Sequence, residues 1–456
     1  MENRVYYPLS PAQHLLFLSR KYTVHKAVLN IPTSMILDVG LDNDLLQKAL
    51  ESAISRWDSF GLRLKEQGKE IKQYFDVRTC ECIEQKDFSK SSEENMLNFF
   101  YKEAQKKMGI LDCPMARFYI VTTPKGNTGI FSVINHIMMD SWAISMFYKD
   151  VMDIYTAMAN NLPLPKEVRS YESCLIKEFE YRNSEAYKKD QEFWINEIGQ
   201  DEPFYTDVNG SQVLERFRKK NKNSDARYSN SFFIRTKADH VVRTIDKEDI
   251  EKMKAFLKAY EFPSMHILFL MGLRTYLSKV NGTNDVSISS IVARRATLEE
   301  KFSGGTRAQF VPFRTIIEED TTFREALNIL LDKENILYRH ADINPMEIFG
   351  MEQRAFPLKQ GQTYRGASLT FQPVPMEIGN GMHAETRWYP NGASAQPFYL
   401  TIMDGDGSGG LKCYYEHIIS HIEPETINTC HDYMLKVILE GISHPEMKLS
   451  ELYHLD

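Results

Sequence analysis

The segment Asn135-His136-Ile137-Met138-Met139-Asp140-Ser141-Trp142 follows a mostly apolar run at residues 129–134. That run predicts a buried strand, and the apolar side chains of residues 141–160 recur at helical spacing, which predicts a helix. The quoted segment therefore forms a loop between a strand and a helix. Loops at strand ends often carry functional side chains, so we take this segment as the candidate site.

His136 is the side chain of this loop that is suited to acid–base chemistry. An imidazole has an ordinary pKa of about 6.5, so near neutral pH it can accept a proton from a nucleophile or orient one. Asp140 is placed either to cap the following helix or to fix the loop through an ion pair. From spacing alone, a structural histidine that bonds to the backbone is favoured over a catalytic one.

Strand and helix patterns alternate on both sides of this loop. Residues 118–121 and 129–134 predict a hairpin with a turn at residues 124–127, and residues 42–57 predict a helix with Asp42 as its N-cap. The second half of the chain continues the pattern with a strand, two helices and another strand, predicted at residues 241–245, from Asp246, at 264–280 and at 285–292. Such alternation indicates layered α/β architecture.

Residues 199–229 differ from their surroundings because they are polar and lack a sustained hydrophobic period. We expect an exposed connection there, close to a domain boundary. The basic run at residues 216–222 is interpreted as part of this solvated connection rather than as a docking patch for an acidic partner.

Composition is that of an ordinary globular protein. The 456 residues include 43% hydrophobic and 26% charged side chains, which excludes a disordered or fibrous chain. Lys and Arg number 55 against 62 Asp and Glu, and the net charge is −7. Without an excess of positive charge, we expect no nucleic-acid partner.

The sequence also argues against membrane insertion and metal binding. The first residues lack the apolar stretch of a secretory signal, and the longest apolar run, at 267–271, is far shorter than the roughly 20 residues that cross a bilayer. Six scattered cysteines show no pairing or zinc pattern. Residues 404–409 begin like a calcium loop, but position twelve is Tyr415 and not Glu, so a hairpin turn is favoured. We expect a soluble, cytoplasmic protein without a metal.

Five segments in order resemble motifs of the condensation domains of nonribosomal peptide synthetases, which belong to the chloramphenicol-acetyltransferase-like acyltransferase superfamily. The central one, Asn135 to Ala143, is similar to HHxxxDGWS and here has the form NHxxxDS. The others are Ser10 to Leu18 for SxAQxRLWxL, Arg56 to Leu64 for RHExLRTRF, Gly305 to Arg314 for GxFVNTLPLR, and His340 to Glu347 for HQDLPFE with one insertion. The Arg of a further GR motif falls on Arg295 at the family spacing.

The resemblance implies an α/β fold with mixed-sheet layers. Two chloramphenicol-acetyltransferase-like lobes would form a V-shaped pseudo-dimer with a central tunnel, which two carrier arms enter from opposite faces. We expect the N-terminal lobe, with the NHxxxDS motif, at residues 1–180 and the C-terminal lobe, including the connection near 199–229, at residues 181–456.

The resemblance also assigns roles in the loop. His136 takes the position of the family's catalytic histidine, as a general base or as an orienter of the attacking amine. Asp140 resembles the structural aspartate that pairs with an arginine of the second lobe, for which Arg295 is the first candidate and Arg294 the second. That pair would hold the loop in shape without moving protons.

Two departures affect this loop. Asn135 replaces the first histidine of the motif, a supporting position at which an amide still donates and accepts hydrogen bonds. Ser141 replaces the glycine, which removes conformational freedom where a positive φ is needed but supplies an alternative helix cap. Heterocyclising relatives have Asp and Ser at the positions of Asn135 and Ala143, so the sequence disfavours a cyclisation reaction.

The resemblance implies an acyltransferase that forms an amide bond between an acyl or aminoacyl thioester, carried on a phosphopantetheine arm, and an amine, in nonribosomal peptide or lipopeptide biosynthesis. The expected partners are donor and acceptor carrier proteins or a free small-molecule amine. The thioester supplies the activation, so we expect no bound cofactor. The alternatives are an O-acyltransferase with an alcohol acceptor and a non-catalytic domain that recruits a partner. We expect a monomer, either freestanding or part of a larger synthetase.

Overall fold

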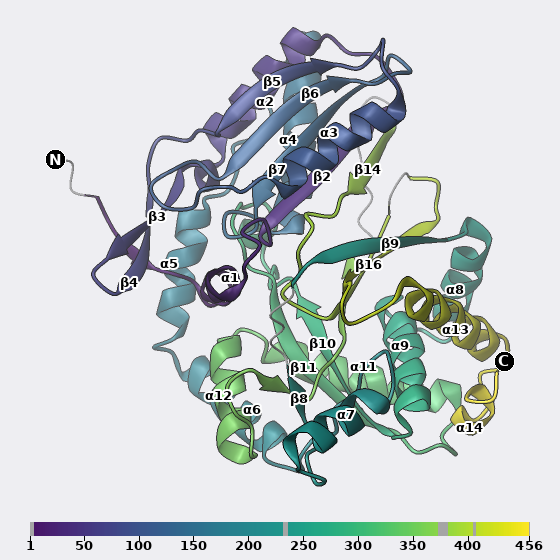
Figure 1. The fold of residues 1–456 in the computed structure, drawn as a ribbon. Helices are drawn as coiled ribbons and strands as arrows, with labels where there is room; N and C mark the ends of the chain where they lie inside the picture. The colour runs from purple at the N-terminus through teal and green to yellow at the C-terminus, as the bar shows by residue number, and fades with distance from the viewer. Residues whose placement is uncertain (1–3, 231–235, 373–381, 405–406, 456) are drawn as a thin grey trace.

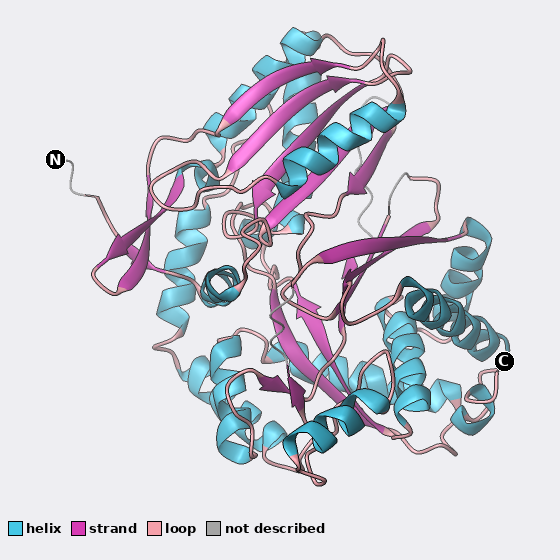
Figure 2. Cartoon of the chain, viewed as in Figure 1, coloured by secondary structure: helices cyan, strands magenta, loops and turns pink. Residues whose placement is uncertain are grey.

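Two β-sheets, each with its own hydrophobic core, organise the chain (Figures 1 and 2). The computed structural model describes residues 4–230, 236–372, 382–404 and 407–455. One core is built almost wholly from residues of the first half and the other from residues of the second half. The two lobes meet beside the loop that follows residue 135.

The first sheet has five strands in the order β14-β2-β7-β6-β5. The strands are β2 (Asn30–Leu37), β5 (Cys82–Asp87), β6 (Ala116–Thr122), β7 (Thr128–Asn135) and β14 (Ala384–Trp388). Only the β5–β6 pair is parallel. Helix α3 (Glu93–Gln105) covers one face, and α2 (Asn43–Arg56) and α4 (Ser141–Ala159) cover the other (Figure 1). Every residue of β7 is buried, which explains its apolar run.

Smaller elements extend the first lobe. A three-stranded sheet has the order β1-β4-β3. Its strands are β1 (Tyr7–Pro8), β3 (Leu62–Gln67) and β4 (Glu70–Phe75), with α1 (Pro11–Tyr22) and the 3-10 helix η1 (Asp58–Gly61) nearby in the chain. Helix α1 begins with a capping box in which Ser10 and Gln13 bond to each other's backbone.

The second sheet has six strands in the order β11-β10-β13-β15-β16-β9. The strands are β9 (Ala238–Ile245), β10 (Asp285–Val292), β11 (Gln309–Ile316), β13 (Ser368–Gln372), β15 (Phe398–Met403) and β16 (Leu411–Ile418). The pairs formed by β13 with β10 and with β15 are parallel and the rest are antiparallel. The sheet is therefore mixed, as expected from the family.

Helices cover the second sheet and link the lobes. Nearly all of α9 (His266–Asn281) is buried, and most of its side chains are apolar. The other elements are α5 (Tyr171–Tyr181), α6 (Glu185–Ile198), α8 (Lys247–Ala259), α10 (Leu298–Lys301), α11 (Phe323–Arg339), α12 (Pro345–Ala355), α13 (Pro424–Ser443), α14 (Leu449–Leu452), and the short pair β8 (Ser229–Asn230) and β12 (Gln362–Thr363). Among the described helices, none is both long and apolar enough to cross a membrane.

Strand β14 crosses from the second half of the chain to the first sheet. It pairs with β2 in antiparallel register, with Trp388 opposite Thr33 and Ala384 opposite Leu37. Tyr389, directly after it, is buried in the first core. A segment of the second half thus completes the first lobe, while the predicted boundary between residues 180 and 181 stays a prediction.

The prediction of an exposed connection at 199–229 is wrong. Helix α7 (Gln212–Asn221) occupies its middle. Leu214 and Phe217 lie three positions apart on one face of this helix and are buried, and Phe217 packs against Tyr228. The helix has three apolar side chains, Val213, Leu214 and Phe217, within five residues, which is too short a stretch to give a sustained period. The sequence pattern therefore does not reveal the helix. The basic run falls on the last turns of α7, where Arg218 donates to the Ala226 carbonyl at 2.8 Å.

Most of the other predicted elements are confirmed. The hairpin is β6 and β7, the helix after Asp42 is α2, and α4, α9 and β10 lie where the periodicity places them. Asp42 accepts hydrogen bonds from the amides of Asp44 and Leu45, both at 3.0 Å, as an N-cap does. Residues 405–406 of the predicted turn at 404–409 lie outside the described residues.

Candidate active site

Backbone hydrogen bonds fix the loop between β7 and α4 at three points. The Asn135 amide donates to the Met115 carbonyl at 2.9 Å, and the His136 amide donates to the Leu29 carbonyl at 2.7 Å. The Asp140 amide donates across to the second lobe, to the Gly305 carbonyl at 3.2 Å. The loop is thus held by both lobes, and its conformation depends on how they meet.

Asp140 is the centre of this contact between lobes. Its carboxylate accepts hydrogen bonds from one Arg295 nitrogen at 2.9 and 3.0 Å, and both side chains are buried. It also accepts from the amide of Ala143 at 2.9 Å, which caps α4, and from that of Arg307 at 2.9 Å. Burial acts to raise the pKa of Asp140, but the Arg295 charge and these amides outweigh it and lower that pKa. The carboxylate is therefore charged at neutral pH.

The predicted pairing of Asp140 with Arg295 is present, and the second candidate, Arg294, has other partners. Arg294 donates to Glu178 at 2.9 Å and to Asp342 at 2.8 Å. Consecutive arginines point to different partners because Arg294 adopts a left-handed backbone conformation, with φ 53°.

His136 lies half-buried at a pocket between the lobes. Its Nδ1 is buried and has no hydrogen-bond partner among the residues that the structure describes. We therefore expect Nε2 to be the ring nitrogen that meets a bound molecule. Thr306 of the second lobe donates to the His136 carbonyl and steadies the loop. Burial lowers the pKa of His136, only partly opposed by its own carbonyl and the charges of Asp140 and Glu416, so the imidazole is neutral near pH 7.

The supporting residues predicted in this loop have distinct places. Asn135 is fully buried, and its Oδ1 accepts from the Ile137 amide at 3.1 Å, which shapes the turn before the helix. Ser141 is the first residue of α4 and lines the pocket. Asp140, not Ser141, caps the helix, so the prediction of an alternative cap is wrong. A helical residue needs no positive φ, so serine is compatible with this backbone.

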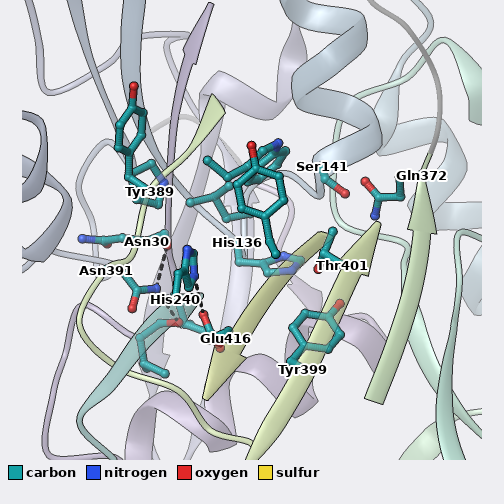
Figure 3. A pocket seen from close by; sticks show the side chains of 16 residues that line it. Asn30, His136, Ser141, His240, Gln372, Tyr389, Asn391, Tyr399, Thr401 and Glu416 are labelled. Atoms are coloured by element: carbon teal, nitrogen blue, oxygen red, sulfur yellow. Dashed lines mark hydrogen bonds and ion pairs between the residues drawn. The ribbon is translucent and has the colours of Figure 1, made fainter. Parts of the chain in front are cut away.

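The pocket has a cavity volume of about 170 Å³ and is formed by both lobes (Figure 3). The first lobe supplies His136, Ser141 and the chain around Asn30. The second supplies its sheet face and the segment after β14. The described lining residues are Val28, Leu29, Asn30, Ile31, Pro32, His136, Ser141, His240, Gln372, Trp388, Tyr389, Asn391, Tyr399, Thr401, Tyr414 and Glu416.

Several polar residues of the second lobe were not predicted from the sequence. Asn391 donates to the Asn30 carbonyl at 2.9 Å and so ties the segment after β14 to the start of β2. Burial raises the pKa of Tyr399 to about 12, so its hydroxyl stays protonated and able to donate. In β16, Tyr414 and Glu416 alternate with the core residues Cys413 and Tyr415. That alternation predicts a strand with one face in the core, but it does not predict that the face with Tyr414 and Glu416 meets the pocket beside His136.

Comparison with known proteins identifies the family. The family model for the condensation domain matches residues 3–456. The chain belongs to the condensation domain family. Surfactin synthase subunit 1 of Bacillus subtilis (strain 168) is 21% identical over 456 residues, covering 98% of this condensation domain and 12% of the relative. Bacitracin synthase 1 of Bacillus licheniformis is 19% identical over 453 residues, covering 99% and 8%. The condensation domain thus spans only about a tenth of the length of these two relatives.

Solved structures share the fold of this condensation domain. The first condensation domain of the calcium-dependent antibiotic synthetase, in complex with a substrate analogue, superposes with a TM-score of 0.81 at 16% identity, covering 98% of each chain. The starter condensation domain of rhizomide synthetase, in complex with C8-CoA, gives a TM-score of 0.82 at 14% identity, covering 99% of this chain and 98% of that one. The predicted family and α/β fold are confirmed. Condensation domains of nonribosomal peptide synthetases are acyltransferases that form amide bonds.

Proposed function

We propose that this condensation domain transfers an acyl or aminoacyl group from a thioester on a carrier protein's phosphopantetheine arm to an amine. The amine nitrogen attacks the thioester carbon, the carbon–sulfur bond breaks, and an amide and a free thiol form. The observation that supports this most strongly is the placement of His136, which lines a pocket built by both lobes. The expected partners are donor and acceptor carrier proteins or a free amine.

His136 acts on the proton of the attacking amine. A neutral imidazole accepts a hydrogen bond from the amine, and it takes the proton as the nitrogen becomes positive during attack. The low pKa of His136 keeps the imidazole in the neutral form that this role requires. Holding the amine and the thioester at the right distance lowers the activation free energy by several kcal/mol, about 7 or more in well-oriented systems.

Asp140, Arg295 and Asn135 support His136 without touching substrate. The buried ion pair fixes the end of the loop, and the Asn135 side chain fixes its beginning. These contacts hold the backbone on both sides of His136. The thioester supplies the activation, so the proposal needs no metal, nucleotide or bound cofactor. A tunnel that joins two entrances at opposite faces stays a prediction.

A donor and acceptor panel tests the proposal. Purified protein is incubated with acyl groups on a carrier protein or on coenzyme A, together with amine or alcohol acceptors, and products are quantified by mass spectrometry. We expect amides from carrier-bound donors. Esters would establish the alcohol-acceptor alternative, and no product from any pair would favour recruitment without catalysis.

The variant His136→Ala then tests the residue assignment. We expect kcat to fall about 10²- to 10⁴-fold, the usual contribution of a positioned acid or base. The matched control is His444→Ala, because the His444 side chain is 62% exposed at the end of α13 and is not among the described residues that line the pocket. Unchanged product formation by His136→Ala would contradict the assignment.

A further inference from the structure

The pocket beside His136 has an unbalanced charge. Glu416 is the one carboxylate among its described lining residues, and those residues include no lysine or arginine. The Glu416 side chain is 24% exposed, so solvent reaches it only in part. A carboxylate in a partly closed pocket is costly unless a positive partner or hydrogen-bond donors accompany it.

Strand pairing places Glu416 on the pocket face of the second sheet. In β16 it lies directly opposite His240 of β9 on one side and Tyr399 of β15 on the other. Directly opposed residues share a face of the sheet, and all three line the pocket. Figure 3 shows Glu416 between His240 and Tyr399, close to His136.

His240 positions Glu416 without supplying a permanent charge. Its Nε2 lies 3.5 Å from a Glu416 carboxylate oxygen, so the contact is weak, and a histidine is positive only when protonated. The His240 Nδ1 is buried without a hydrogen-bond partner among the described residues. While His240 is neutral, Glu416 leaves one uncompensated negative charge that faces the substrate space.

We propose that Glu416 is a specificity-determining residue that selects a substrate with a positively charged group, such as the ammonium of an aliphatic side chain. This group is distinct from the reacting amine, because a carboxylate stabilises the protonated amine and a protonated amine cannot attack a thioester. The inference rests on the proposed function and names the substrate class for the same site.

A matched pair of amino acids tests the inference. Ornithine and norleucine have side chains of the same length, and the first ends in an ammonium where the second ends in a methyl group. Each is offered in one arm as the acceptor and in a second arm as the aminoacyl donor on a carrier protein. The arm in which the two amino acids react at different rates shows whether Glu416 contacts the donor or the acceptor. We expect kcat/KM to favour ornithine about tenfold or more in that arm, the size expected of a hydrogen bond to a charged group.

The variants Glu416→Gln and Glu251→Gln then locate the effect. We expect Glu416→Gln to bring the ratio of kcat/KM for ornithine to kcat/KM for norleucine close to one, while keeping the shape of the pocket. The second removes an exposed carboxylate on α8 and keeps the preference. A wild-type protein that uses both amino acids equally in both arms would overturn the inference while leaving the proposed function intact, as would a preference that survives Glu416→Gln.

A binding measurement separates this inference from the proposed function. Calorimetry on the His136→Ala variant compares ornithinamide with norleucinamide, and carrier-linked ornithine with carrier-linked norleucine. Tighter binding of the ornithine form supports the inference even where no transfer is detected. Equal binding in both comparisons, with no discrimination in turnover, contradicts it.

Discussion

Arg295 and Asp140 are 155 positions apart in the chain, yet one guanidinium nitrogen of Arg295 lies 2.9 and 3.0 Å from the two carboxylate oxygens of Asp140. Asp140 begins the helix after the His136 loop, and Arg295 follows the end of β10 in the other lobe. The His136 loop therefore takes this conformation only when both lobes are folded and docked.

The variant Arg295→Ala leaves the Asp140 charge buried without its partner. We expect the free energy of unfolding to fall by about 3–5 kcal/mol, as when one member of a buried pair is removed. Urea denaturation measures the change. The control is Arg243→Ala, whose partner Asp432 has a 63% exposed side chain, so its effect should stay below about 1 kcal/mol. Equal effects of the two variants would show that the buried pair does not stabilise the fold.

The neutral state of His136 predicts a pH profile. Burial lowers its pKa in the folded chain, so between that value and about 6.5 the unfolded chain binds the extra proton. This residue's contribution to stability is thus fully present above about pH 6.5 and is lost as pH falls toward the folded pKa. NMR titration of the histidines should give a midpoint for His136 below 6.5. A midpoint above that value would mean that the nearby carboxylates outweigh burial.

Capping by Asp140 predicts that Ser141 matters little for stability. We expect Ser141→Ala to change the free energy of unfolding by less than about 0.5 kcal/mol, because its hydroxyl makes no cap. Ser92 provides the comparison, since its hydroxyl accepts from the Asn95 amide as the N-cap of α3. Ser92→Ala should cost about 1 kcal/mol. A larger cost for Ser141→Ala than for Ser92→Ala would contradict the assignment of the cap.

Gly305, whose carbonyl binds both the Asp140 amide and Arg295, has no room for a side chain. Its φ is +80°, and an added Cβ would lie 2.0 Å from ring atoms of Tyr171. We expect Gly305→Ala to destabilise the protein by about 4 kcal/mol or more, combining strain and overlap. Gly126 has φ +83° in open space, so Gly126→Ala should show the strain alone, about 1–2 kcal/mol. Thermal unfolding of both variants checks the difference.

Local patterns and motif spacing were enough to predict the His136 loop. The periodicity around residues 129–160 indicated the strand and the helix, and the resemblance indicated Asp140 and Arg295 as partners. The row of His240, Glu416 and Tyr399 was not predictable, because it depends on which strands are neighbours in the sheet. Strand β16 lies between β9 and β15, and β9 precedes it by more than 160 residues. No local pattern encodes such a pairing.

The crossing of β14 limits how far the two lobes can separate. The strand is bonded into the first sheet, whereas β13 before it and β15 after it belong to the second. Trp388 of β14 and Tyr389 directly after it also line the pocket beside His136, so the crossing strand forms part of the pocket wall. The two lobes cannot separate fully without breaking the pairing of β14 with β2.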